Sequence, residues 1–477
     1  MTFEQENFFI KIIRDIAKRK NVSIHLVGGF LRDHALGSNG YDFDFAVEKK
    51  ALEIARLFAQ KIKGAYILLD AERGCARVAK RKQGRIMTFD FSDFRAKTFR
   101  QDLNLRDFTI NTLSVDLFQW DPDHKIEGVL KNFKSALKDL REKRIKMVSP
   151  KAFDDDPLRM LRAFSLKATL SFKIERRTLD QIKKKKHLIR EVSYERIRDE
   201  LFKILETDQA INELKTMARI GLLENIIPQI RVMYRCKQGA YHHLEVWPHS
   251  LQTVWEAEKI YLDVKKNPEI ADYFEEKLGG QRTRKALWKL AALLHDIGKP
   301  DARRKKDGKF YFYGHERVGQ HIVRHVSKML KLSTRERHIL EDMVRWHLRP
   351  GYLSNFRKPT ERAIYRYFRD TKDEALSILL LSLADQRSTR GPLTTENDQR
   401  HHEKICLKLV KQYFDKKKEK PFTRFINGDD LIKTLKLQPS PLFGKILSEV
   451  EEKQILGKIK TKKEALVLAK EIVLKKR

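Results

Sequence analysis

Cysteine is scarce in this chain, and no hydrophobic run is long enough to cross a membrane. Among 477 residues there are three cysteines, Cys75, Cys236 and Cys406, which lie far apart and form neither a pair nor a metal-ligand spacing. Such sparse cysteines are typical of a reducing cytoplasm. The longest apolar run, residues 375–384, is too short for a bilayer, and residues 1–21 are charged and lack a cleavage site. We therefore expect a cytoplasmic protein with no membrane partner.

Acidic residues are outnumbered by basic ones. The 100 Lys and Arg residues face 65 Asp and Glu residues, which leaves a formal net charge of +35. Nucleic acid is the first expected partner, because neutralising its phosphates releases counterions. An anionic membrane surface is a second reading, and general basicity of the source proteome is a third. With 41% hydrophobic and 35% charged residues, the chain is expected to fold with a strongly ionic surface.

Residues 1–148 mix strand and helix patterns, whereas the rest of the chain is helical. At roughly 150 residues per domain, the length predicts about three domains. An α/β or α+β unit is expected first, and residues 234–248 are expected to form a linker between helical parts. The predicted strands are residues 23–27, 42–47, 67–69 and 86–91, and the predicted helix among them is 52–62.

The first candidate site combines a glycine turn with two acidic residues on a strand. Gly28 and Gly29 follow the strand at residues 23–27 and precede a helix, so backbone N–H groups there can approach phosphate oxygens. In the next strand Asp42 and Asp44 point to one face, while the phenylalanines beside them point to the core. Mg²⁺ would relieve the repulsion between these carboxylates and bind substrate phosphates. A solvated acidic edge strand is the alternative.

Two further pairs of basic and acidic residues follow. Arg106 can hold a triphosphate bidentately and Asp107 can accept from a ribose hydroxyl, although such a pair is also a common surface salt bridge. Asp156 precedes Pro157, which suits the first position of a helix, so Asp156 can be the N-cap. Asp156 and Arg159 are three residues apart and are expected to share a helix face. Such an acceptor and donor match cytosine and adenine, and leave guanine and uracil unpaired.

In this order the motifs resemble those of the class II tRNA nucleotidyltransferases and the related bacterial poly(A) polymerases. They are G-G-F-L-R-D at 28–33, D-F-D at 42–44, R-D-F-T-I-N at 106–111 and D-D-P-L-R-M-L-R-A at 155–163. The resemblance implies template-independent addition of C, C and A, from CTP and ATP, to the 3′ end of tRNA. The implied Mg²⁺ ligands are Asp42 and Asp44, and the implied nucleotide-binding residues are Gly28, Gly29, Arg32, Arg106, Asp107, Asp156, Arg159 and Arg162.

A second candidate site lies in the helical part of the chain. His249, then adjacent His295 and Asp296, then Asp385 follow one another in the order H…HD…D. An adjacent His and Asp at a helix end offer nitrogen and oxygen ligands to a divalent metal and leave a position open for water. The set resembles the HD phosphohydrolases, which implies metal-dependent hydrolysis of a cyclic phosphate or a nucleotide phosphate. Candidates for phosphate contact or a second metal are Lys299, His315 and His347.

Together the two resemblances imply an α+β fold class with four parts. These are a mixed-sheet nucleotidyltransferase head at 1–148, an all-α neck at 149–232, an HD domain at 233–400 and a helical, tRNA-contacting C-terminal segment at 401–477. Within the neck, Glu195 and Arg198 belong to a segment, Y-E-R-I-R-D-E-L, that also resembles the family.

Three departures from the family pattern leave the number of added nucleotides open. Leu105 stands where the family usually has Arg, Asp155 where it usually has Glu, and residues 91–102 are short where many members have a flexible loop. A shortened loop is associated with relatives that perform only the CC or only the A step. The alternatives are a single-step enzyme, a poly(A) polymerase, or an HD phosphohydrolase whose head only binds RNA. The last is disfavoured because every chemical position of the head is present.

Overall fold

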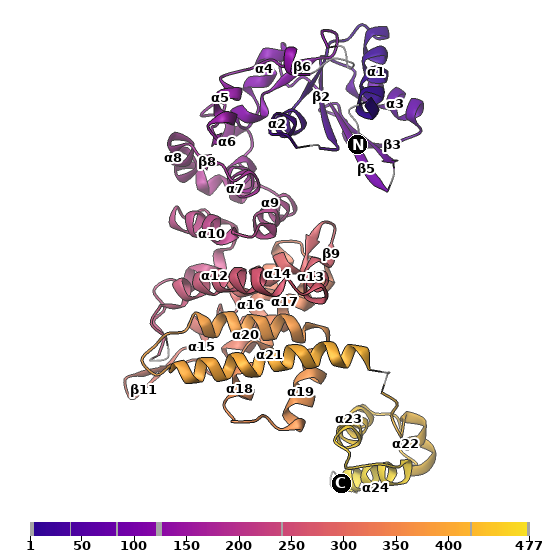
Figure 1. Cartoon of the computed structure of the whole chain (residues 1–477), viewed down its shortest axis with the longest axis vertical. Coiled ribbons are helices and arrows are strands. Elements are labelled where there is room, and N and C mark those ends of the chain that lie inside the picture. The colour runs from indigo at the N-terminus through magenta and orange to yellow at the C-terminus, as the bar shows by residue number, and fades with distance from the viewer. Residues whose placement is uncertain are drawn as a thin grey trace. The chain divides into compact units, whose positions relative to one another are not determined.

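The computed structural model describes residues 4–38, 40–82, 84–120, 126–239, 242–419 and 422–474. The chain folds as two units, Met1–Pro228 and Gln229–Arg477, which Figure 1 colours from indigo to yellow. None of the helices in the described ranges combines the length and the apolar character that a bilayer crossing requires.

The first unit contains a six-stranded mixed sheet. The strand order is β3-β4-β5-β2-β1-β6, in which β2 and β5 are parallel and the other neighbours are antiparallel. The four predicted strands are present, and β4 and β6 are additional. The strands are β1 Ile24–Val27, β2 Asp42–Val47, β3 Ala65–Asp70, β4 Cys75–Lys82, β5 Arg85–Asp93 and β6 Ser114–Asp116.

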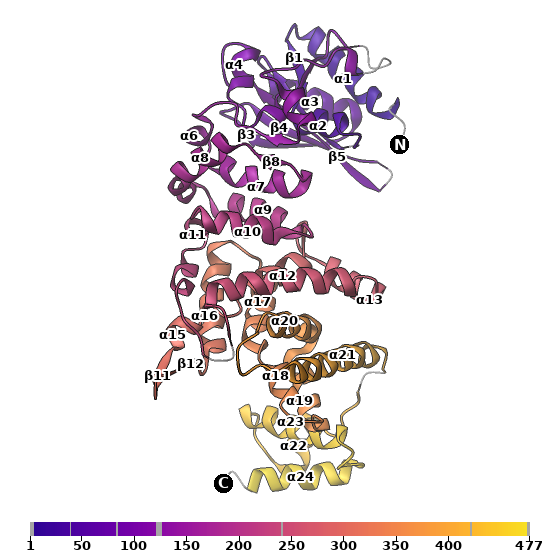
Figure 2. The ribbon, with the colours of Figure 1, turned by 60° about the vertical axis from the view of Figure 1, so that its left-hand side comes forward.

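Helices α1 (Glu4–Arg19) and α3 (Ala51–Ile62) pack against one face of this sheet, as Figure 2 shows. Alternate residues of a strand point to the same face, so the phenylalanines of β2 and β5 meet there. Phe43 stacks on Phe89 with ring centroids 5.1 Å apart. This layer leaves the acidic residues of the same strands on the opposite face. Its buried aromatic residues are Phe9, Phe43, Phe45, Phe58, Phe89 and Phe91.

Short helices complete the head, and longer ones form the neck. The parallel pair of β7 (Arg144–Ile145) and β8 (Lys173–Ile174) links the two parts, so the neck is not purely helical. The head helices are α2 Gly29–Ala35, α4 Phe99–Asn104 and α5 Ala136–Arg141, with 3₁₀ turns η1 Thr109–Asn111 and η2 Ile126–Gly128. The neck has α6 Ala152–Asp155, α7 Leu158–Leu170, α8 Arg176–Lys185, η3 Lys186–Glu191, α9 Tyr194–Glu206, α10 Ala210–Arg219 and α11 Leu223–Ile226.

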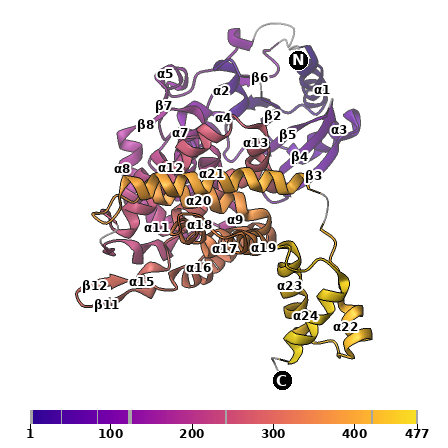
Figure 3. The same cartoon turned by 60° about the horizontal axis from the view of Figure 1, so that its bottom comes forward.

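The second unit is built around α20 (Ala375–Arg387), which contains the apolar run noted in the sequence. Residues 375–384 are all buried, as expected of a helix that is apolar on every side. Figure 3 shows α21 beside it. The other elements are η4 Pro228–Met233, α12 Val246–Val264, α13 Pro268–Glu275, β9 Lys277–Gly279, β10 Arg282–Thr283, α14 Arg284–Leu294, α15 Lys299–Ala302, β11 Arg304–Lys306, β12 Lys309–Tyr311, α16 His315–Met329, α17 Thr334–Trp346, α18 Arg349–Ser354, α19 Glu361–Thr371, η5 Lys372–Glu374 and α21 Glu396–Lys418.

Two segments of this unit differ from the prediction. The expected linker at 234–248 is shorter, because α12 already begins at Val246 and includes His249. The expected boundary between residues 400 and 401 falls inside α21, whose inner face is buried against α20.

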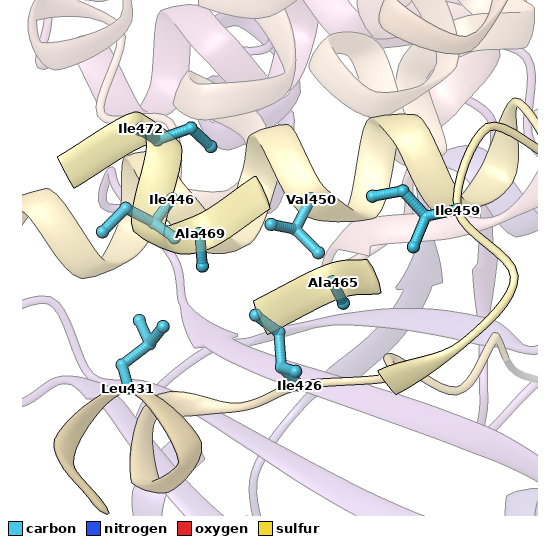
Figure 4. Packing of buried hydrophobic residues seen from close by; sticks show 8 residues of the cluster. All are labelled: Ile426, Leu431, Ile446, Val450, Ile459, Ala465, Ala469 and Ile472. Carbon is cyan, nitrogen blue, oxygen red and sulfur yellow. The ribbon is translucent and has the colours of Figure 1, made fainter. Parts of the chain in front are cut away.

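Three C-terminal helices enclose a small core of their own. They are α22 Gly428–Leu435, α23 Pro441–Ile455 and α24 Lys462–Leu474. Figure 4 shows the eight buried side chains between them, among them Leu431, Val450 and Ile472. Glu452 of α23 accepts a hydrogen bond from Arg366 of α19 at 2.8 Å, which attaches these helices to the rest of the unit.

Candidate active site and metal centre

Three carboxylates share one face of the sheet where β2 and β5 run in parallel. The register places Asp44 beside Asp90 and Asp42 beside Thr88, and the Thr88 hydroxyl donates a hydrogen bond to Asp42. Asp42 and Asp44 therefore point to one face, as predicted. Asp90 is absent from the predicted site, although residues 88–91 repeat the alternation of polar and aromatic residues found at 42–45.

Two of these carboxylates, Asp90 and Asp44, interact with arginines or with each other. Arg77 of β4 binds Asp90 through two N–H···O hydrogen bonds, each 2.7 Å long. Burial raises the pKa of Asp44 to about 6, and the charge of Asp90 adds to this, while Arg106 opposes it. A bound cation would therefore stabilise the ionised form of the Asp44 carboxyl in place of the proton. Adjacent carboxylate oxygens are the donor set that Mg²⁺ prefers, so these residues fit the metal that the sequence predicts.

The glycine turn before α2 lies directly against Asp44. Gly28 has φ +83°, and a Cβ there would lie 2.6 Å from Oδ2 of Asp44. The backbone N–H of Gly29 donates a hydrogen bond to the same carboxylate. Only glycine adopts this backbone conformation without strain and leaves room for the acid. The turn thus positions Asp44, besides offering N–H groups to an anion.

We expect Gly28→Ala to destabilise the protein by about 1–3 kcal/mol, from backbone strain and from displacement of Asp44. Gly29→Ala is the matched control, because its added methyl would meet only the flexible end of Arg32, at 3.5 Å. Chemical denaturation of both variants measures the difference. Equal stabilities would show that the contact with Asp44 does not constrain residue 28.

Beside the acidic face lies a cavity of about 330 Å³ lined by three arginines. Nη1 of Arg32 donates to Oδ1 of Asn111 at 2.8 Å, which aims the side chain. The side chain of Arg106 is only 15% exposed, and its Nε is buried with no hydrogen-bond partner among the described residues. A buried donor without a partner is costly, so this guanidinium suits an anionic ligand. The lining also includes Gly28, Gly29, Asp44, Asp107, Arg162, Ser165, Glu200 and Lys203.

Asp107 forms the opposite wall of this cavity and stays ionised. Its Oδ2 accepts from Nε of Arg162 at 3.0 Å, and its Oδ1 accepts from the Asn111 side chain at 3.0 Å. Burial alone would raise the pKa of Asp107, but Arg162 and these hydrogen bonds hold it at about 2. A carboxylate with two oxygens can still accept a further hydrogen bond from a ribose hydroxyl.

The expectation that Asp156 and Arg159 share a helix face is wrong, whereas the alternative, Asp156 as an N-cap, agrees with the structure. Asp156 is extended, with φ −152°, and α7 begins only after Pro157, so spacing rules for helices do not apply across this point. Oδ1 of Asp156 accepts from the Leu158 N–H at 3.2 Å, as an N-cap does. Nη2 of Arg159 donates instead to the Leu105 carbonyl at 2.8 Å. Both residues line a second, larger cavity of about 1190 Å³.

In the second unit, the four predicted metal ligands converge from three helices. Nε2 of His249, in α12, lies 2.9 Å from Oδ1 of Asp385, in α20. His295 follows α14, and its Nε2 lies 3.7 Å from the same oxygen. Oδ2 of Asp296 lies 3.3 Å from His295 Nε2 and 3.6 Å from His249 Nε2. The H…HD…D set is therefore one buried cluster.

Two further histidines, both named from the sequence, meet the other oxygen of Asp296. Nε2 of His315 lies 3.2 Å from Oδ1 of Asp296, and Nε2 of His347 lies 3.7 Å from it. The Asp296 carboxylate thus lies between two groups of ligand atoms: His249, His295 and Asp385 on one side, and His315 and His347 on the other. These side chains would hold one or two divalent cations, with Asp296 facing both groups of ligand atoms.

The histidines of this cluster are oriented for coordination through Nε2. Nδ1 of His295, His315 and His347 lies 2.7–2.9 Å from a backbone carbonyl three residues earlier. Each Nδ1 therefore carries the hydrogen, which leaves the lone pair on Nε2. Burial and the neighbouring imidazoles lower the pKa of His347 to about 3. Burial alone would lower the pKa of His295, but Asp296 and Asp385 raise it to about 10. A bound metal cation would supply, in place of the proton, the positive charge that these two carboxylates favour.

Four family profiles match the chain in order. They are the Poly A polymerase head domain at residues 24–146, the RNA and SrmB-binding site of polymerase A at 171–233, the HD domain at 246–390 and domain 2 of tRNA nucleotidyltransferases at 417–469. Over 92% of its length the chain is 29% identical to the A-adding tRNA nucleotidyltransferase of Deinococcus radiodurans, covering 93% of that protein. It is 28% identical to the CC-adding tRNA nucleotidyltransferase of Thermus thermophilus, and the match covers 92% of this chain and 91% of that protein. The chain belongs to the class II tRNA nucleotidyltransferases.

Solved structures support the fold of this nucleotidyltransferase. A CCA-adding enzyme in complex with ATP matches with a TM-score of 0.65 and 20% identity, over 100% of this chain and 97% of that one. The Thermotoga maritima CCA-adding enzyme complexed with tRNA matches with a TM-score of 0.61 and 20% identity, over the same shares. The α+β head followed by helical domains is thus confirmed. Both the head and the HD families use divalent metals.

Most predicted residues of the transferase site line the smaller cavity or the acidic face. The exceptions are Asp156 and Arg159, which line the neighbouring cavity. In the neck, Glu200 and Lys203 of α9 reach the smaller cavity, whereas Glu195 and Arg198 are not among its lining residues. Asn111 and Glu200 also line the smaller cavity. Both can be predicted from the sequence, because they belong to the motifs at 106–111 and 194–201.

Proposed function

We propose that this enzyme adds CMP or AMP units from CTP or ATP to the 3′ end of tRNA without a template. The observation that carries the proposal is the acidic face of β2 and β5 beside a cavity lined by three arginines. The relatives named above are A-adding and CC-adding tRNA nucleotidyltransferases, which agrees with this chemistry.

In this reaction the chain's own residues bind and orient. Arg32, Arg106 and Arg162 would hold the triphosphate in the smaller cavity, with Asp107 at the ribose. Mg²⁺ bound by Asp42 and Asp44, with Asp90 beside them, would activate the tRNA 3′-hydroxyl and neutralise charge on pyrophosphate. The bond from the 3′-oxygen to the α-phosphorus forms as the bond to the β-phosphate bridging oxygen breaks. Pyrophosphate leaves, and the hydroxyl proton passes to water.

We assign base selection to Asp156 and Arg159, which both line the larger cavity. Oδ2 of Asp156 accepts from Arg196 at 2.8 Å, and a carboxylate has capacity for the amino group of cytosine or adenine as well. Because Arg159 is engaged by the carbonyls of Ala152 and Leu105, it would have to change partners to contact a base.

We expect Asp156→Asn to weaken discrimination against UTP about tenfold, because an amide can donate to the uracil O4 where a carboxylate cannot. Competition between labelled CTP and UTP, for incorporation into tRNA, measures the ratio. Asp180→Asn, the same change at an exposed residue of α8 that does not line this cavity, is the control. An unchanged ratio in Asp156→Asn would remove this residue from base selection.

A single-step reaction is favoured over complete CCA addition. Only residues 94–98 connect β5 to α4, and this connection is tied down. Backbone N and Nε of Arg95 both donate to Oδ1 of the buried Asp102, at 3.1 and 3.0 Å. The shortened loop noted in the sequence is therefore also a restrained one.

A panel of tRNA 3′ ends tests the proposal. Transcripts that end before C74, after both C residues, or after the complete CCA are incubated with labelled CTP or ATP. Single-step chemistry predicts that either CTP with the first transcript or ATP with the second is used, but not both. Use of both would establish full CCA addition, and repeated ATP addition to the complete transcript would establish poly(A) polymerase activity.

For the HD domain we propose metal-dependent hydrolysis of a phosphate ester, such as a 2′,3′-cyclic phosphate or a nucleotide phosphate. The cluster of four histidines and two carboxylates carries this proposal. Water adds to phosphorus while the ester bond breaks, which yields a phosphate and an alcohol. Lys299, whose Nζ lies 2.6 Å from Oδ2 of Asp296, would contact the phosphate of a substrate bound at this cluster.

A further inference from the structure

A hairpin at the rim of the HD domain carries a dense set of basic and aromatic side chains. It consists of β11 and β12, and it projects beside α15 in Figure 2 and Figure 3. From Arg303 to Tyr313 the chain reads R-R-K-K-D-G-K-F-Y-F-Y, which is five basic residues, one acidic residue and four aromatic rings. Neither the transferase site nor the metal cluster uses these side chains.

The register of the hairpin sorts these residues onto two faces. Arg304 pairs with Tyr311, and Lys306 pairs with Lys309. Cross-strand partners share a face, so one side presents three cations and a tyrosine. The other side presents Lys305 and Phe310, and the guanidinium of Arg303 lies over the Phe310 ring.

The cationic face continues into an exposed aromatic platform. Tyr313 is 83% exposed and stacks on Tyr311, with ring centroids 5.6 Å apart and planes at 16°. Lys305, Lys306 and Lys309 are exposed and form no salt bridge among the described residues. Parallel rings beside unpaired cations are the arrangement that binds single-stranded nucleic acid, through base stacking and phosphate contacts.

The base of the hairpin borders the metal cluster. The Phe312 carbonyl accepts the Nδ1–H of His315 at 2.8 Å, and Nζ of Lys299 lies over the Phe312 ring at 5.9 Å. A strand bound along the hairpin would thus have its end next to the cluster. An exposed aliphatic side chain, which a membrane-inserting loop would use, is absent from residues 303–313.

We propose that the β11–β12 hairpin with Tyr313 is a binding arm for single-stranded RNA, which presents a terminal phosphate to the HD centre. Binding by the arm is independent of hydrolysis, whereas presentation of the phosphate rests on the hydrolase function proposed above. The phosphate-bearing end of an oligonucleotide is then the substrate class of the HD domain.

Photocrosslinking of the full chain to an oligouridylate that contains 4-thiouridine tests the arm. We expect the peptide with Tyr311 and Tyr313 to be labelled. The variant Lys306→Glu should reduce this labelling about fivefold or more, whereas Lys305→Glu, the same charge change on the opposite face, should reduce it less. No label on this peptide, or equal losses in the two variants, would overturn the proposal. So would vesicle binding, with anionic phosphatidylglycerol, that depends on Lys306 while crosslinking does not.

Hydrolysis assays with two substrates distinguish RNA binding by the arm from the chemistry of the HD centre. We expect Lys306→Glu to raise the KM for a 3′-phosphorylated oligonucleotide about fivefold and to leave hydrolysis of p-nitrophenyl phosphate unchanged. Wild-type protein that hydrolyses neither substrate refutes the hydrolase function, while the crosslink still decides RNA binding. Equal KM values for the oligonucleotide would refute presentation by the arm.

Discussion

Replacement of both Asp42 and Asp44 by alanine is expected to reduce nucleotide incorporation at least about 10³-fold. Metal-assisted stabilisation of the transferring phosphate is worth several kcal/mol, and about 1.4 kcal/mol corresponds to tenfold in rate. Without these carboxylates, only Asp90 of the acidic face remains, and Arg77 already engages it. Incorporation of labelled CMP and AMP into tRNA, followed over time, measures the loss.

Loss of folding would imitate this result, so the variant needs a stability control. Asp44 is half-buried and its pKa is raised to about 6; we therefore expect Asp44→Asn to fold at least as stably as wild type. Its incorporation rate should still fall by a large factor, since an amide is a weaker ligand for Mg²⁺. A folded Asp44→Asn enzyme with wild-type activity would remove Asp44 from the chemistry.

The second large effect is expected in the HD domain. Asp296→Ala should abolish hydrolysis of p-nitrophenyl phosphate with Ni²⁺, Co²⁺ or Mn²⁺, because this carboxylate faces both groups of ligand atoms. The number of bound metal ions should distinguish the role of Asp296 from that of a histidine in one of the two groups. Asp296→Ala should lose both cations, whereas His347→Ala should lose one. Elemental analysis of dialysed protein gives the number of bound ions.

Nucleotide incorporation is the control for these HD variants, and we expect it to be unchanged in Asp296→Ala. If the variant retains both metal binding and hydrolysis, the assignment of the HD centre is wrong. If wild type binds one cation only, the expectation of two bound cations is wrong, although the four predicted ligands can still form a single-metal site.

Local patterns predicted the parts of the transferase site that lie on one strand. The alternation at 42–45 specifies both the aromatic core and the acidic face, because side chains of a strand alternate. Asp90 reaches the same face only because β5 pairs with β2. In the sequence β3 and β4 lie between these strands, and no local pattern specifies that pairing.

Two of the corrections concern the ends of helices. Pro157 correctly indicates the start of a helix, and this places Asp156 outside it, where the three-residue spacing no longer implies a shared face. Val246 begins α12 within a segment rich in Tyr and His that was expected to be a linker. In both cases the local residues are compatible with more than one boundary, and tertiary packing decides.

The HD cluster was predicted in part for a similar reason. The order H…HD…D names four candidate ligands, and their side chains lie close together in the structure. That His315 and His347 meet the second oxygen of Asp296 depends on how α16 and α17 pack near α14. Sequence spacing names these two histidines as candidates, but only their positions in space show which oxygen they face.

The most direct test of the central claim follows the label in the nucleotide. Wild-type enzyme is given tRNA ending before or after the two C residues, with CTP or ATP labelled at either the α- or the γ-phosphate. We predict that tRNA gains α label and no γ label, that pyrophosphate appears in equal amount, and that Asp42→Ala with Asp44→Ala stops the transfer. Transfer of γ label, no transfer to any transcript, or α transfer that survives the double substitution would contradict this prediction.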